Sequence, residues 1–146
     1  MTLSNSPAEI VRKLLVDLSL GTEPSAGGSW PVYDGQVPDS PDDCIVVLDT
    51  VGVMLGRLQP TGEQVEDYGV QVTVRAAKHE DGYPKAEAIS HALDQTVRNT
   101  PAVIGGNMYL VYRLQRKTQA LPIGKEPQSS RVLFTINALV ALKQTA

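Results

Sequence analysis

The sequence predicts an α+β fold: a two-layer sandwich in which two helices cover one face of an antiparallel or mixed sheet of about four to five strands. Two observations carry this prediction. Apolar residues alternate along 68–76, as in a strand with one buried face. After a turn at 81–84 the period becomes helical, and apolar positions recur at helical spacing up to Asn99. A strand and a helix that each bury one side form half of a layered domain.

Length and composition set the outer limits. The 146 residues suffice for one domain with a sizeable core, so we expect residues 1–146 to form a single unit. The formal net charge of −3 does not favour a protein that wraps nucleic acid. Cys44 is the only cysteine, which excludes an internal disulfide and a multi-cysteine zinc site. The sequence has no secretory signal and no run of ~20 apolar residues, so we expect a soluble protein made in the cytoplasm.

A first helix is predicted to begin at Ser6. Serine at the cap, proline at the first helical position and Glu9 three residues after the cap form a capping box. Gly21 is placed to end the helix. Its apolar residues recur at helical spacing and indicate packing on a sheet: Ile10, Val11, Leu14, Leu15 and Leu18.

Glycine and proline residues predict a long loop over 22–43. Trp30 and Tyr33 give this loop apolar surface with which it can dock on the body, and 32–35 could pair as a short edge strand. The spacing of its acidic residues does not match a calcium-binding loop. We therefore interpret them as solvated turn carboxylates: Asp39, Asp42 and Asp43.

The apolar run 44–49 predicts a central strand covered on both faces, with the Cys44 thiol buried. We expect the strand to pair in antiparallel fashion with 67–77, across a long excursion at 50–66 that contains glycine. In the second strand, polar residues alternate with the apolar ones and therefore lie on the opposite face. This more polar face is a candidate contact surface and carries Gln71, Thr73 and Arg75.

The C-terminal part predicts a hairpin of 102–104 and 108–116 around a glycine-rich turn. Its second strand has apolar residues on both faces, so we expect it to lie centrally or to meet another subunit. Prolines and a glycine exclude regular structure from the polar loop 117–130, which is the most basic loop because of Arg116, Lys117 and Lys125. The alternation over 131–142 predicts a final strand.

No pattern of catalytic residues stands out in the sequence. It has no recognisable motif that would place a nucleophile beside its general base, and no phosphate-binding or dinucleotide-binding loop. His79 and His91 lack the further partners that a zinc site needs, and Glu87 and Asp94 could support a charged His91 on a solvated helix face. We therefore predict a protein that is not an enzyme and that holds no cofactor and no metal.

The order of elements and one stretch of the long loop resemble the minor capsid and tail-terminator (tail completion) proteins of long-tailed bacteriophages. That stretch contains Tyr33, Gly35, Pro38, Pro41 and Asp42 just before an apolar strand, and the resemblance extends over nearly the whole chain. It implies a small α/β subunit that forms a ring, typically a hexamer, at the head-proximal end of the tail tube. Such a ring stops tube polymerisation and presents a surface for the head connector.

The resemblance also implies partners and a location. The partners would be further copies of the chain, the tail tube protein and a head-completion or connector protein, with no membrane involved. The protein would assemble in the host cytoplasm and end in the virion tail. Ring closure needs a heterologous contact between two different edges of the subunit, for which the candidate residues are Gln71, Thr73, Arg75, Arg116, Lys117 and Lys125.

Three acidic residues are candidates for the wall of the bore: Glu63, Glu66 and Asp67. Facing the bore, they would repel DNA and let it pass without sequence-specific binding. The alternative is a small-ligand-binding or regulatory α+β domain without catalysis, in which the loop around Trp30 and Tyr33 covers a pocket.

Overall fold

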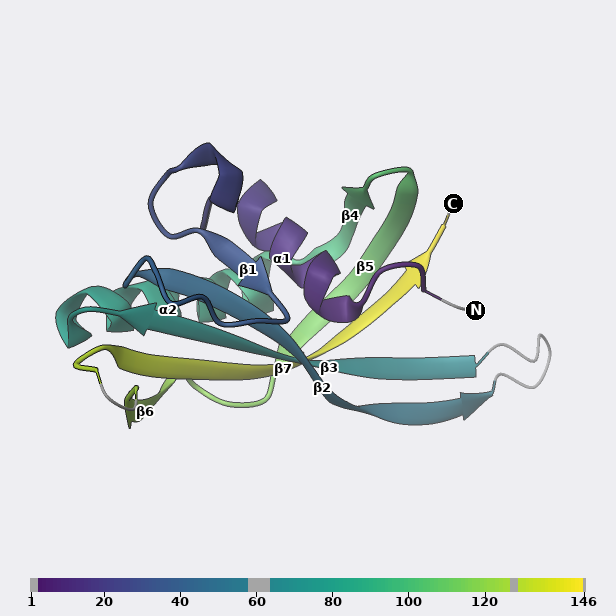
Figure 1. Cartoon of the computed structure of the whole chain (residues 1–146). Helices are drawn as coiled ribbons and strands as arrows, with labels where there is room; N and C mark the ends of the chain where they lie inside the picture. The colour runs from purple at the N-terminus through teal and green to yellow at the C-terminus, as the bar shows by residue number, and fades with distance from the viewer. Residues whose placement is uncertain (1–2, 58–63, 127–128, 146) are drawn as a thin grey trace.

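The structure, a computed structural model, describes residues 3–57, 64–126 and 129–145. Within these ranges it has two α-helices, one short 3-10 helix and seven strands (Figure 1): α1 (Pro7–Asp17), η1 (Pro24–Ala26), β1 (Val32–Asp34), β2 (Cys44–Arg57), β3 (Gln64–Ala76), α2 (His79–Thr96), β4 (Arg98–Ile104), β5 (Asn107–Arg116), β6 (Leu121–Lys125) and β7 (Val132–Gln144). The α+β class is confirmed. The predicted four to five strands are too few, since the described chain forms a sheet of seven.

One mixed sheet contains these strands in the order β1-β2-β3-β7-β5-β4, and β6 also pairs with β7. The described pairs are antiparallel except for β1 and β2, which run parallel. The sheet is strongly twisted, and β4 and β5 curl toward α1 (Figure 1). The order places β1 and β4 at opposite ends of the sheet.

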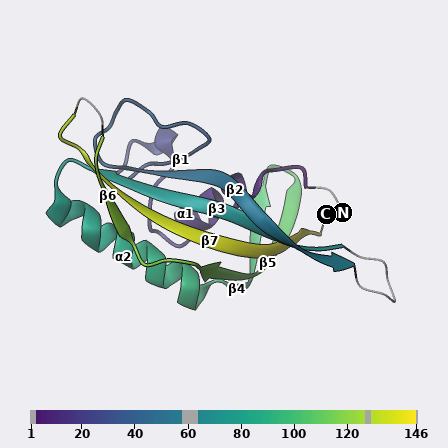
Figure 2. The same cartoon turned by 90° about the horizontal axis from the view of Figure 1, so that it is seen from below.

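Both helices pack against the apolar side chains of the sheet in one common core. The register sets Val72 opposite Ile136 and Val74 opposite Phe134, so β3 and β7 present apolar side chains to that core. In Figure 2, which views the molecule from below, α1 lies behind the sheet. The helices contribute the other half of the core: Ala8, Ile10, Val11, Leu14 and Leu15 from α1, and Ala86, Ile89 and Leu93 from α2.

The predicted start of α1 is confirmed, because the Ser6 hydroxyl accepts a hydrogen bond from the Glu9 N–H at 3.3 Å. The helix ends at Asp17, before Gly21. Gly21 has a different role, since a Cβ there would lie 2.3 Å from Cγ2 of Val32. The glycine thus allows the chain that follows α1 to approach β1 closely.

α2 begins at His79 and ends at Thr96, about one turn before the predicted limits at each end. Its first turn is fixed by tertiary packing, because the rings of His79 and Phe134 meet edge to face with 5.3 Å between centroids. Tyr83 lies against the same phenyl ring at 6.1 Å. Apolar contact with β7 therefore adds a turn that local sequence alone does not indicate.

Within the predicted loop 50–66, the described residues 50–57 and 64–66 belong to strands β2 and β3. Pairing of β2 with β3 continues out to Arg57 and Gln64, so the two strands form an arm that projects beyond the rest of the molecule (Figures 1 and 2). A β-bulge follows Thr50, and the two strands approach closely there. A Cβ at Gly52 or Gly69 would lie 2.1 or 2.4 Å from a carbonyl oxygen of the facing strand, so glycine is required at both positions.

The loop 117–130 also contains regular structure that the sequence did not predict. Leu121–Lys125 forms β6 and pairs with β7 despite Pro122 and Gly124. The register shift between these two residues accommodates them, as bulges do at sheet edges. The predicted hairpin is confirmed as β4 and β5, with Gly105 at φ 59° in the turn.

Candidate functional site

A groove of about 450 Å³ lies on the sheet face opposite the helices. Strands β2, β3 and β7 form its floor, and the loop after β1 and strand β6 form its walls. Two wall residues, Val37 and Ile123, are 51% and 56% exposed, whereas Val46 on the floor is buried. The groove is lined by Val37, Val46, Gln71, Thr73, Arg75, Ile123, Glu126, Leu133 and Thr135. We call this feature the sheet groove; its apolar walls suit a segment of another chain.

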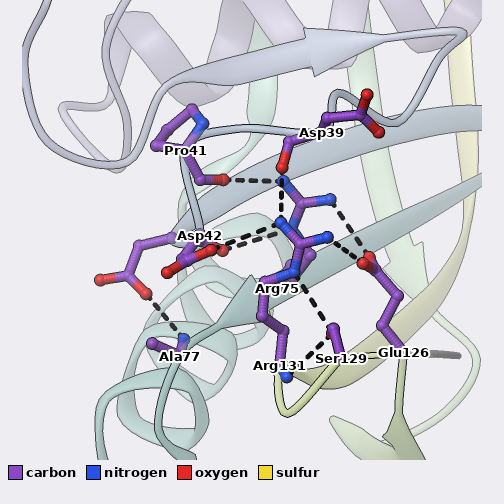
Figure 3. A network of polar contacts seen from close by, with 9 residues as sticks. Asp39, Pro41, Asp42, Arg75, Ala77, Glu126, Ser129 and Arg131 are labelled. Carbon is purple, nitrogen blue, oxygen red and sulfur yellow. Dashed lines mark hydrogen bonds and ion pairs between the residues drawn. The ribbon is translucent and has the colours of Figure 1, made fainter.

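Two residues that line the sheet groove, Arg75 and Glu126, form an ion pair (Figure 3). Arg75 on β3 is only 1% exposed, and its Nη1 lies 3.2 Å from Oε2 of Glu126. Its other N–H groups donate to the carbonyl oxygens of Pro41 at 2.7 Å and Asp42 at 3.3 Å. Arg75 therefore holds two segments, 39–43 and the chain after β6, over the sheet.

Arg131 joins the same two segments from the other side (Figure 3). Its guanidinium pairs with Glu126 and donates to the carbonyl oxygen of Asp39 at 2.6 Å. It also lies 3.4 Å from a carboxylate oxygen of Asp42. Two arginines thus share Glu126, and the walls of the sheet groove are fixed by charge-assisted hydrogen bonds. We call Arg75, Glu126 and Arg131 the arginine latch.

The latch determines the charge state of Glu126. Burial raises the pKa of this carboxyl, but hydrogen bonds from Arg131 and Arg75 and their charges outweigh burial and hold the pKa below its ordinary value. Glu126 is therefore ionised at neutral pH, and the latch carries its full charge there. Protonation in acid would leave the buried Arg75 guanidinium with neutral acceptors only.

A second apolar surface lies on the outer face of the β4–β5 hairpin. Val103, Met108 and Tyr112 are 46%, 47% and 40% exposed. Val103 is directly opposite Met108 in the register, and half-buried Leu110 lies opposite Pro101. These five residues form one contiguous area, which we call the hairpin patch. Clusters of exposed apolar side chains of this kind commonly mark contacts between proteins.

The prediction that 108–116 has apolar residues on both faces is confirmed, with one face buried and the other exposed. β5 lies between β4 and β7, and its inner residues Tyr109, Val111 and Leu114 are buried. The outer face is exposed and has a basic border: Lys143 of β7 places its Nζ 5.9 Å from the ring centroid of Tyr112. Arg113 adds a second, largely exposed positive charge beside it.

The candidate contact residues from the sequence lie in different environments. Gln71 and Thr73 are half-buried on the floor of the sheet groove, where Gln71 donates to Asn137, and Arg75 lines the same groove but is buried in the single chain. Arg116 faces α2, donating to Ser90 at 2.6 Å. The remaining two, Lys117 and Lys125, are exposed.

The acidic candidates are placed only in part. Asp67 is buried and pairs with Arg113 at 3.4 Å, so its charge is offset within the subunit. Glu63 and the side chain of Glu66 lie outside the described residues. Their position relative to a bore stays a prediction.

Other residues that the sequence singled out have internal roles. Cys44 is buried as predicted, and burial raises the pKa of its thiol. His91 pairs with Glu87 at 3.1 Å, while Asp94 pairs with Arg116 instead. Among the described residues no group of three or more histidine, cysteine or acidic side chains is placed to hold a metal ion. No described helix is long and apolar enough to cross a membrane.

A cavity lies next to Tyr33, and charged side chains that line it are paired with one another. This cavity of about 540 Å³ is lined by Tyr33, Arg12 and Asp34 among others. Arg12 lies 2.9 Å from Glu23 and 3.6 Å from Asp34, so two carboxylates neutralise it. In the described part of the chain no buried side-chain nitrogen or oxygen lacks a hydrogen-bond partner.

The sequence did not reveal the arginine latch. Glu126 and Arg131 stand in a polar loop, and nothing local links them to Arg75, which is 51 residues before Glu126. The hairpin patch could be found in part, because the two-faced pattern of 108–116 indicated it.

Comparison with known families matches residues 14–142 to the model of a family described as bacteriophage tail terminator protein. The match includes all residues of the sheet groove and of the hairpin patch. No curated protein matches the chain. Among solved structures, a chain from the virion of a native gene transfer agent (GTA) particle is similar, with 18% identity, coverage of 90% of this chain and 91% of that chain, and a TM-score of 0.47.

Proposed function

The chain belongs to the bacteriophage tail terminator protein family and is a structural protein of a phage tail, and on this premise we propose that its subunits close into a ring at the head-proximal end of the tail tube. The ring ends tube polymerisation and forms the joint to the head connector. We take the hexamer as the working number of subunits. The role is structural and needs no catalysis and no cofactor.

One observation supports a ring in particular: the subunit has two different apolar surfaces on one sheet. The sheet groove lies over β2, β3 and β7, and the hairpin patch lies on β4 and β5 at one end of the strand order. A closed ring needs a heterologous contact, in which one surface of a subunit meets a different surface of its neighbour. A subunit with two unlike apolar surfaces has the material for such a contact.

The remaining partners would bind outside this contact. The projecting β2–β3 arm extends beyond the body and is a candidate for contact with the tail tube or the connector (Figure 1). Exposed Lys117 and Lys125 are further candidates. DNA would pass through the bore without sequence-specific binding, in keeping with the formal net charge of −3.

Light scattering coupled to size-exclusion chromatography tests the proposed function. The purified chain is measured alone and with the tail tube protein of the same phage, and negative-stain electron microscopy identifies rings and tube ends. We expect a ring, either in free solution or on the end of the tube, and shorter tubes as the chain is added. A chain that stays monomeric and leaves tube length unchanged would refute the proposal.

A further inference from the structure

We propose that the two apolar surfaces bind each other, so that the hairpin patch of one subunit docks in the sheet groove of a second copy of the chain. This inference rests on the proposed ring and names the contact that closes it. Val103, Met108 and Tyr112 of one copy would lie against Val37 and Ile123 of the next.

The apolar character of both surfaces supports the pairing. Each has side chains about half exposed in the single chain, at 40–47% on the hairpin patch and 51–56% on the walls of the sheet groove. The groove has a volume of about 450 Å³, and the patch lies on a two-stranded hairpin. A β-hairpin face entering a walled groove would remove both sets of apolar side chains from water.

The charges around the two surfaces are complementary. The loop 34–43 beside the sheet groove carries four acidic residues and no basic residue. Arg12 and Arg131 pair with Asp34 and Asp42 within the subunit, whereas Asp39 and Asp43 have no ion pair among the described residues. The hairpin 98–113 carries two arginines and no acidic residue, and Lys143 borders the patch on β7. The carboxylate of Asp39 points away from both latch arginines, so it is directed outward (Figure 3). Opposite charges at the edges of the sheet groove and of the hairpin patch favour contact between these two surfaces and disfavour contact between two hairpin patches.

The position of the surfaces makes the contact intermolecular. β4 is the last strand of the sheet order, and β5 separates it from β7, the nearest strand of the groove floor. A rigid sheet cannot fold its own end strand onto that floor. Repeating the contact from copy to copy would give a head-to-tail chain of subunits, which closes as a ring if the rotation permits.

Site-directed crosslinking tests the contact. The double variant Met108→Cys/Ile123→Cys places one thiol on each surface, and native Cys44 does not interfere because it is fully buried. The full-length chain is treated with a short thiol-to-thiol crosslinker under the conditions in which the wild type forms rings, with tube protein if rings require it. We expect a ladder of covalent multimers on a denaturing gel.

Matched controls separate this contact from random collision. Met108→Cys paired with Glu80→Cys, on an exposed position at the start of α2, should give no ladder. Met108→Cys alone should give no crosslinked dimer. A strong dimer band would overturn the proposal, because it would indicate that the hairpin patches of two copies contact each other. Rings that form normally while the Met108/Ile123 pair gives no ladder would also overturn the contact, although the proposed function would stand. A wild type without rings, alone or with tube protein, would overturn both.

Charge reversal gives a second readout that does not depend on cysteine chemistry. Asp39→Lys should weaken assembly about tenfold or more, because it opposes Lys143 and Arg113 of the neighbour. Adding Lys143→Glu to the same chain should restore part of the loss. An unchanged assembly in Asp39→Lys, in a variant that unfolds at the wild-type temperature, would count against the proposed orientation.

Discussion

Glu126→Gln is the substitution that tests the arginine latch most directly. It keeps the size of the side chain and removes the charge that Arg75 and Arg131 share. The Arg75 guanidinium is only 1% exposed and would lose its one carboxylate partner, at present 3.2 Å away. A positive charge would then stay buried with neutral acceptors only.

The cost can be derived from these contacts. Removing one partner of a buried ion pair costs about 3–5 kcal/mol. Glu126 is 20% exposed, and Arg75 keeps its bonds to the carbonyls of Pro41 and Asp42, so the loss is smaller here. We expect the free energy of unfolding to fall by about 2 kcal/mol. At this chain length that corresponds to a Tm lower by about 4–8 °C.

Urea unfolding at a series of pH values measures the effect and its sign. The pKa of Glu126 is below its ordinary value in the folded chain, so its stabilisation is present above the ordinary carboxyl pKa. It is lost as the pH falls through the lowered value, where protonated Glu126 resembles glutamine. The difference between wild type and variant should therefore be constant near neutral pH and shrink in acid.

Glu87→Gln is the matched control, because Glu87 pairs with His91 on an exposed helix face. It should cost less than about 0.5 kcal/mol. Equal losses in the two variants at neutral pH, or a Glu126→Gln difference that persists undiminished in strong acid, would refute the reasoning about the latch.

Three further substitutions or measurements address other parts of the fold. Gly69→Ala would place a Cβ 2.4 Å from the Val51 carbonyl oxygen and should lower the free energy of unfolding by about 1–3 kcal/mol. Amide hydrogen exchange should be faster in the β2–β3 arm, and an unchanged exchange rate there would contradict the close approach of the two strands. Ser6→Ala removes the cap of α1 and should cost about 1 kcal/mol in thermal unfolding, and an unchanged Tm would argue against the cap. The Cys44 thiol should react with a thiol reagent only as fast as the chain unfolds, since it is buried and its pKa is raised; rapid reaction in the native protein would contradict this.

Local features of the fold could be predicted from the sequence because their physical causes are local. The capping box at Ser6 needs only four consecutive residues, and the alternation along 68–76 reports directly which face of β3 is buried. The hairpin around Gly105 follows from turn chemistry. The resemblance to tail-terminator proteins, based on element order and the loop motif, agrees with the family match over 14–142.

The tertiary structure decided what depends on residues far apart in the chain. Alternation correctly assigns Arg75 to the face away from the helices, but it cannot show that 39–43 and Glu126 cover that face and bury the guanidinium. Glycines made 50–66 resemble a loop, whereas strand pairing and a bulge place the described residues 50–57 and 64–66 in an arm. The sheet groove likewise exists only where β6 and the loop after β1 meet over the sheet. The helices and the main strands can be read from the sequence because short-range periodicity encodes them, and the family resemblance can be read from the order of these elements and the loop motif. Only the tertiary structure determined which polar residues are buried and which apolar residues stay exposed, because burial depends on long-range packing.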